Sequence, residues 1–152
     1  MKPLFVLLVT FIVATLATKI IGGNFDFALS ARIALSVMLL FTAIGHFAFT
    51  KGMTMMIPDF IPFKKEIVYM TGIIEIVAAI CLLIPSVQVA TGWLLILFFV
   101  LLLPANINGA IQHIDYQKGT TNGAGLAYLW FRIPLQILFI VWVYLSSIRC
   151  CS

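Results

Sequence analysis

The chain has 152 residues, of which 63% are hydrophobic and only 9% charged. Its mean hydropathy of +1.18 excludes an ordinary soluble domain, in which about 25% of residues carry charge. The formal net charge is +4, but the nine basic residues are scattered beside apolar runs, as membrane-interface anchors are. We therefore expect a single domain whose partner is the lipid bilayer, and no binding of nucleic acid.

Five hydrophobic segments follow one another along the chain, separated by turn-forming or charged residues. They cover residues 3–21, 29–49, 66–84, 87 to about 113, and 126–147. A helix needs about 20 apolar residues to cross a hydrocarbon core of ~30 Å. The pattern predicts an all-α, polytopic membrane helical bundle. Residues 28–149 would form its main four-helix domain, and residues 1–24 would add an N-terminal transmembrane helix.

The first segment allows two interpretations. Lys2 followed by a long apolar run is typical of a signal peptide. Against this, the region Thr15-Leu16-Ala17 lacks a clean small-x-small cleavage pattern, and the apolar run is long for a signal peptide. We expect a retained helix, with a signal peptide as the alternative.

Residues 51–65, between the second and third segments, form neither a plain loop nor a spanning helix. They contain three methionines, two isoleucines and two phenylalanines, which are too apolar for a solvated loop. Pro58 and Pro62 interrupt any long helix. We expect an interfacial segment that lies over one mouth of the bundle.

Two ionisable residues stand inside the apolar segments. Glu75 lies near the middle of the third segment, and Arg132 lies about 9 Å into the fifth. Such a group costs about 2.5 kcal/mol or more unless it is neutralised, paired or facing a wet cavity. The natural expectation is an ion pair between Glu75 and Arg132, because each would hold the other in its charged form.

Other polar residues are expected in the same half of the membrane. A rise of 1.5 Å per residue places them on the side of residues 51–65. The candidate pocket comprises His46, Tyr69, Glu75, Asn106, Arg132 and Gln136. In it Asn106 and Gln136 would supply hydrogen bonds, and His46 would accept or donate a proton. The cluster fits a pocket for a polar head group, quinone or proton, or alternatively a lock that only holds the helices in register.

Metal and nucleotide chemistry are not indicated. His46 and His113 lie too near the surface for a haem between two helices, and the chain has no zinc-ligand spacing. It also has no P-loop and no GxGxxG motif. The terminal Cys150-Cys151 pair is not a CxxC motif, so we read it as a plain tail rather than as a redox dithiol.

An ordered set of short motifs between about Ala31 and Tyr144 resembles the DoxX family of small integral membrane proteins. The motifs are Gly45-His46-Phe47, Met56-Ile57-Pro58, Ile61-Pro62, Val68-Tyr69, Thr71-Gly72, Glu75, Leu82-Leu83-Ile84-Pro85, Pro104-Ala105-Asn106-Ile107, and Leu129-Trp130-Phe131-Arg132-Ile133-Pro134-Leu135-Gln136. The resemblance implies a compact four-helix core, here the second to fifth segments. It also implies a link to membrane redox systems, including quinone-linked sulfur oxidation and oxidative-stress complexes.

The resemblance to the DoxX family implies a function in a membrane redox system. We expect an accessory subunit of a quinone-linked redox system in a bacterial inner membrane, with redox proteins as partners and a quinone as the one cofactor to consider. A stand-alone enzyme is not expected. Animal relatives look like receptor-assembly chaperones, so the fold does not name a reaction. The alternative is therefore a membrane assembly or scaffold factor whose Glu75, Arg132 and Asn106 cluster is purely structural.

The distribution of basic residues and the family pattern give opposite indications of the membrane orientation. The side of residues 51–65 would collect Lys2, Lys51, Lys64, Lys65 and Lys118, and the other side Lys19, Arg32 and Arg149. The positive-inside rule would place the first side in the cytoplasm. The family pattern places it outside, and we follow the family pattern.

Overall fold

The structure is a computed structural model that describes residues 2–149. Its helices are α1 (Lys2–Gly22), α2 (Phe27–Ala48), α3 (Thr50–Met56), α4 (Lys64–Cys81), α5 (Gln88–Ile111) and α6 (Leu126–Val143), and a π-helical turn, η1 (Tyr144–Ile148), continues α6. Each of the five predicted segments corresponds to one long helix. The predicted all-α fold class is confirmed. Cys150 and Cys151 lie outside the described residues.

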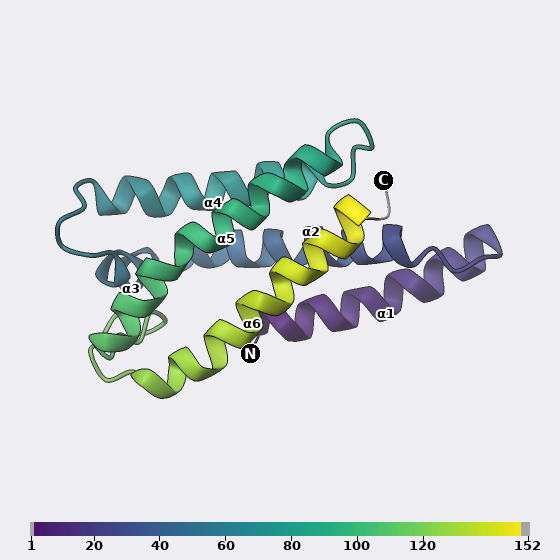
Figure 1. Ribbon diagram of the computed structural model, residues 1–152. Coiled ribbons are helices and arrows are strands. Elements are labelled where there is room, and N and C mark those ends of the chain that lie inside the picture. Colours follow the sequence, from purple (N-terminus) through teal and green to yellow (C-terminus); the bar gives the residue numbers. More distant parts are fainter. Residues whose placement is uncertain (1, 150–152) are drawn as a thin grey trace.

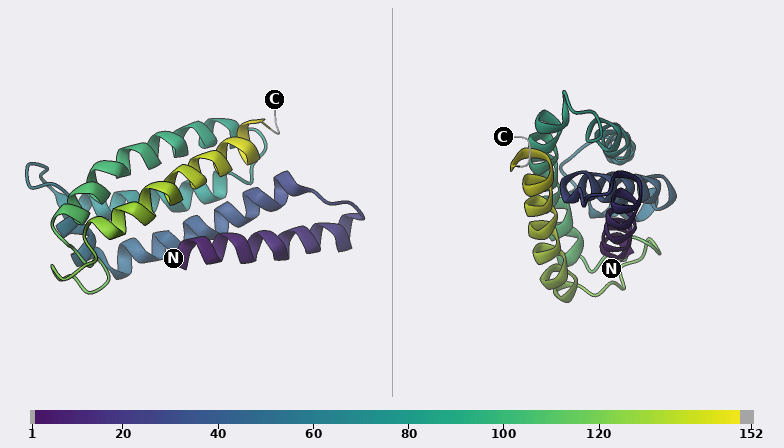
Figure 2. Two further views of the ribbon diagram at one scale, coloured as in Figure 1. Left: turned by 60° about the horizontal axis from the view of Figure 1, so that its bottom comes forward. Right: turned by 90° about the vertical axis from the view of Figure 1, so that its right-hand side faces the viewer.

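Helices α2, α4, α5 and α6 lie side by side as a four-helix bundle, and α1 packs on the outside of α2 (Figure 1). Neighbouring pairs around the bundle are α2 with α4, α4 with α5, α5 with α6, and α6 with α2. Helices α4 and α6 therefore occupy diagonally opposite corners, as the right-hand view of Figure 2 shows. We call the end where α2 finishes and α4 begins end A, and the end with the α4–α5 turn end B.

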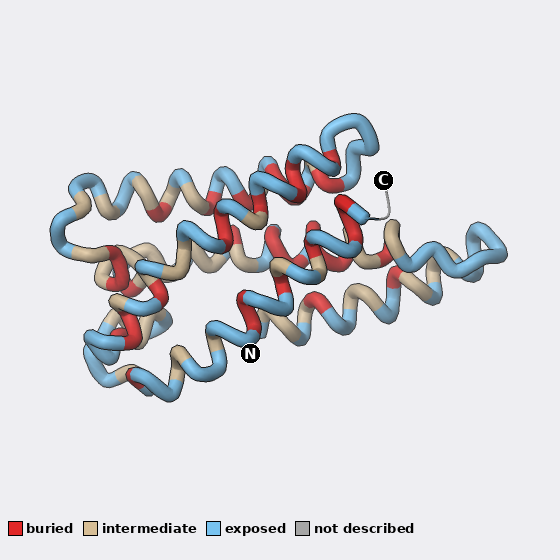
Figure 3. Tube along the Cα trace, in the orientation of Figure 1, coloured by how far each residue is buried: buried red, intermediate tan, exposed pale blue. Residues whose placement is uncertain are grey.

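The bundle is apolar both inside and outside. Its core includes Leu35 and Leu39 of α2, Leu95 of α5, and Leu135 and Val143 of the last helical stretch. Figure 3 shows that the outward faces of the helices are largely exposed, and most of these exposed side chains are large and hydrophobic. Water would disfavour such a surface, whereas lipid tails accept it.

Four helices are long and apolar enough to cross a membrane. They are α1, α2, α5 and α6 with its π-helical continuation. The protein is therefore a multi-pass membrane protein. Helix α4 is not among the four, because its 18 residues include Lys64, Lys65, Glu66 and Glu75. It nevertheless packs along α2 and completes the bundle.

Helix α1 is displaced along the bundle. It begins near the middle of the bundle's length, and its last turn extends beyond the start of α2 (Figures 1 and 2). The Phe11 ring packs edge-on against the Trp142 ring, with centroids 5.1 Å apart, and so holds α1 against α6. Lys2, which we expected at the same end as Lys51, therefore lies away from end A. The expectation that Lys2 lies at the same end as Lys51 is therefore wrong. The sequence gives the length of α1 but not its displacement along the bundle.

Residues 51–65 lie at end A. They form most of α3, an irregular stretch over residues 57–63, and the first turn of α4. The Asn108 amide donates a hydrogen bond of 2.9 Å to the Met56 carbonyl, which ties the end of α3 to α5. In the irregular stretch, Phe60 and Phe63 are 84% and 75% exposed. That this segment lies in the membrane interface stays a prediction.

Candidate functional site

The candidate site lies where α2 and α4 pack most closely. Gly72 of α4 makes this approach possible, because a Cβ atom there would stand 3.0 Å from the His46 Cβ and 3.2 Å from the Phe47 ring. A larger residue would push the helices apart. The small residue thus brings His46 against the inner face of α4.

The His46 ring is held at both nitrogens by α4. Its Nδ1 lies 3.0 Å from the Thr71 hydroxyl oxygen, and its Nε2 lies 3.4 Å from Oε1 of Glu75. The Thr71 hydroxyl donates its own hydrogen to the Val68 carbonyl at 2.8 Å. Thr71 can therefore only accept from His46, so Nδ1 carries a hydrogen. The remaining nitrogen, Nε2, is the one that faces the Glu75 carboxyl.

Glu75 is buried with half of its hydrogen-bonding capacity unused. Its side chain is 5% exposed, and that of His46 is 12% exposed. The Glu75 oxygen Oε2 is buried and has no hydrogen-bond partner among the described residues. Glu75 is 11 residues beyond Lys64, or about 16 Å along the helix. A buried carboxyl oxygen at this depth needs either a proton or a ligand to satisfy it.

Tyr69 belongs to the same contact between α2 and α4. Its ring stacks on the Phe47 ring with centroids 5.7 Å apart. The Lys65 ammonium also lies over the Tyr69 ring, 5.8 Å from its centroid. From end A inward, the contact runs from Lys65 through Tyr69 and His46 to Glu75. His46, Tyr69 and Glu75 thus lie along one contact between α2 and α4.

The predicted pair of Glu75 with Arg132 is wrong. The Arg132 guanidinium lies over the Tyr128 ring of its own helix, 5.8 Å from the centroid, and is half-buried. Within residues 2–149, the ion-pair partner of Glu75 is His46. The physical reason is the diagonal placement of α4 and α6, which leaves α2 and α5 between the two side chains.

Asn106 and Gln136 are both buried, but they do not complete the Glu75 site. The Gln136 amide nitrogen donates to the Phe99 carbonyl, and so joins α6 to α5. Hydrogen bonding by Asn106 to Glu75 is likewise not observed among the described residues.

Thr71 is the residue of this contact that we did not predict. A signal for it existed, because Thr71 and Glu75 are four residues apart and share one face of α4. Its role as the acceptor for His46 depends on the packing of α2 against α4, which spacing alone does not show. No group of three or more His, Cys, Asp or Glu side chains in the described part of the chain is arranged to hold a metal ion.

The fold and site define the class of protein: a multi-pass helical membrane protein with a buried histidine–carboxylate pair. Residues 35–147 match a family described as a domain of unknown function, DUF8561, and the chain belongs to this family. The matched region includes His46, Thr71 and Glu75 and leaves out α1. Searches of curated proteins and of solved structures found no match.

Proposed function

We propose that the protein is a DoxX-like accessory subunit of a membrane redox system, which binds a polar head group at the His46–Glu75 pair. A quinone is the ligand that best suits this pair. The observation that carries the proposal is the buried Glu75 carboxyl, with one oxygen facing His46 and the other lacking a protein partner. A bacterial inner membrane and redox partner proteins are part of the same proposal.

The chemistry of the pair suits the oxygens of a quinone. When Glu75 is protonated, Oε2 can donate a hydrogen bond to a quinone carbonyl, and when it is ionised, Oε2 can accept one from a quinol hydroxyl. The proton moves between the carboxyl and Nε2 of His46, while Thr71 holds Nδ1 and keeps the ring oriented. The protein in this proposal supplies a binding point and a proton, and electrons pass through a partner.

Further support comes from the residues that carry the DoxX resemblance. Gly45-His46-Phe47, Thr71-Gly72 and Glu75 are separated in the sequence but form a single contact in the structure. An arrangement that served only to pack helices would not require ionisable residues in a lipid-facing bundle, where they are costly.

Quinone binding tests the proposal. Purified protein in detergent should unfold at a higher temperature when decylubiquinone is added, because a ligand of the folded state stabilises it. Glu75→Gln should reduce this shift at least severalfold. Ser36→Ala removes a buried hydroxyl of α2 that, like Oε2 of Glu75, has no hydrogen-bond partner within the described residues. This variant should leave the temperature shift unchanged. Equal shifts in all three proteins, or none in the wild type, would reject the proposal.

A scaffold or assembly factor is the second candidate, and one observation favours it. The contact at Gly72 is tight, and neither the pocket at end A nor the pocket between α1 and α2 includes His46 or Glu75. In this case, the pair would hold α2 and α4 in register. Replacing both residues with apolar ones of similar size should then preserve assembly of the partner complex, whereas it would abolish function under the first candidate.

A further inference from the structure

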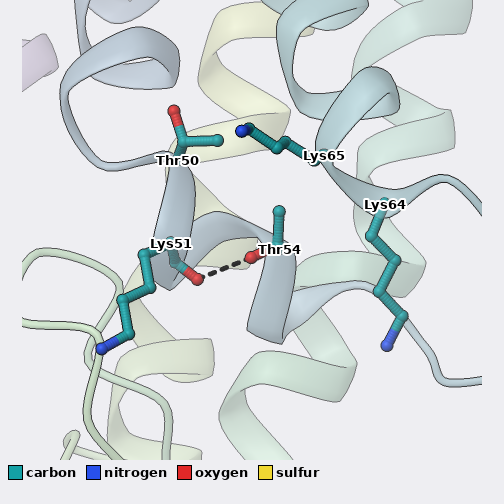
Figure 4. Close-up of a pocket in the computed structure, with 5 residues that line it drawn as sticks. All are labelled: Thr50, Lys51, Thr54, Lys64 and Lys65. Atoms are coloured by element: carbon teal, nitrogen blue, oxygen red, sulfur yellow. Dashed lines mark hydrogen bonds between the residues drawn. The ribbon is translucent and has the colours of Figure 1, made fainter.

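A second feature lies at end A, where it shares Lys65 with the contact between α2 and α4. Between α3 and the start of α4 there is a pocket of about 460 Å³, lined by Thr50, Lys51, Thr54, Lys64 and Lys65 (Figure 4). We infer that this pocket binds the phosphate of an anionic phospholipid headgroup. The inference does not rest on the proposed function, because the pocket lining contains neither His46 nor Glu75.

The charge of the pocket is only partly neutralised. Lys64 forms an ion pair of 2.6 Å with Asp59. Within residues 2–149, no carboxylate lies within ion-pair distance of Lys51 or Lys65. Figure 4 shows Lys65 reaching across the gap towards Thr50, with Lys51 and Lys64 extending on either side of α3. Two cations thus remain available to an incoming anion.

The other polar groups of the pocket leave the lysines as its main phosphate ligands. The Thr50 hydroxyl donates to the His46 carbonyl at 2.8 Å, and the Thr54 hydroxyl donates to the Lys51 carbonyl at 2.7 Å. With their hydrogens used inside the protein, these hydroxyls have none to offer a phosphate. The first turn of α4 adds partial positive charge from its unpaired backbone N–H groups.

The pocket is held in place before any ligand arrives. A Cβ atom on Gly52 would stand 1.9 Å from the Tyr116 carbonyl oxygen, so α3 is pressed against the loop that follows α5. The Asn108 bond to Met56 fixes the other end of α3. A phosphate therefore meets lysines carried by two anchored helices rather than by a free loop.

The surroundings favour a lipid over a soluble anion. Phe60 and Phe63, in the loop that joins α3 to α4, expose their rings beside the lysines. Aromatic rings of this kind lie at the headgroup level of a bilayer, where basic residues attract anionic lipids. The loop rings would contact the glycerol and upper acyl region while the lysines hold the phosphate.

Lipid retention provides the test. We would place the full-length protein in nanodiscs of equal phosphatidylglycerol and phosphatidylcholine and measure retained lipids by native mass spectrometry. The wild type should retain phosphatidylglycerol preferentially. Each of Lys51→Gln and Lys65→Gln should lower this preference about fivefold. Asp59→Asn should raise it, because the carboxylate no longer competes for Lys64. Lys19→Gln, at the opposite end of the bundle, should leave it unchanged.

Two controls keep the outcome clear. Circular dichroism should show native helicity in the glutamine variants, and arginine at the same positions should retain the lipid preference. Equal retention of both lipids by the wild type would overturn the inference, as would an equal loss in Lys19→Gln. Competition by soluble glycerol 3-phosphate as strong as by the lipid would assign the pocket to a soluble anion and reject the lipid.

Discussion

Replacing His46 or Glu75 with leucine should have unequal effects on stability. His46→Leu removes the ion-pair partner of a buried carboxyl whose other oxygen is already unsatisfied. Breaking a buried pair costs about 3–5 kcal/mol, and we expect about 3 kcal/mol because the carboxyl can take up a proton. Glu75→Leu leaves a neutral imidazole that keeps its bond to Thr71. That change should cost only about 1 kcal/mol, the value of one hydrogen bond.

The double variant completes the thermodynamic cycle. With both side chains apolar, no polar atom of the pair remains unsatisfied, so the double variant should cost no more than Glu75→Leu alone. The coupling energy between the two positions should then be at least about 3 kcal/mol. Reversible unfolding of the purified protein in mixed micelles, followed by circular dichroism, measures all four free energies of unfolding.

The decisive result is the difference in destabilisation between His46→Leu and Glu75→Leu. If Glu75→Leu proves more costly than His46→Leu, then the carboxyl has another partner, and the hydrogen-bond assignment at Thr71 is wrong. If the two costs simply add in the double variant, the side chains do not interact. Ser36→Ala, on α2 like His46, serves as the control for loss of a buried polar group. It should lower the free energy of unfolding by less than about 1 kcal/mol.

Two further predictions follow from single contacts. Gly72→Ala should destabilise the protein by about 1–3 kcal/mol and weaken quinone binding, because the added methyl would stand 3.0 Å from the His46 Cβ; unchanged thermal unfolding would contradict this. The neighbouring Lys64 ammonium lowers the pKa of Asp59 below its ordinary value of 3.8. The contribution of this pair is therefore present above pH 3.8 and lost as the pH falls through the lowered pKa. Carbon-13 NMR should show Asp59 titrating below 3.8 in the wild type and near 3.8 in Lys64→Gln; equal midpoints would refute the pairing.

The positions of the helices could be predicted because the signal is local. Each apolar run must satisfy its backbone within itself in a bilayer, so length and hydropathy are enough to predict a helix. Glu75 could be singled out for the same reason, since a carboxylate in such a run is costly wherever its neighbours lie.

The sequence by itself determined that this is an all-α membrane bundle with a polar site in the half nearer end A. Only the tertiary structure decided the partner of Glu75. The rise along a helix predicts depth, and Arg132 and His46 are both possible partners by depth. Which helix stands beside α4 depends on the packing of all the helices, and that packing places α2 next to α4 and α6 diagonally across. His46 therefore meets Glu75, and Arg132 stacks on Tyr128 instead.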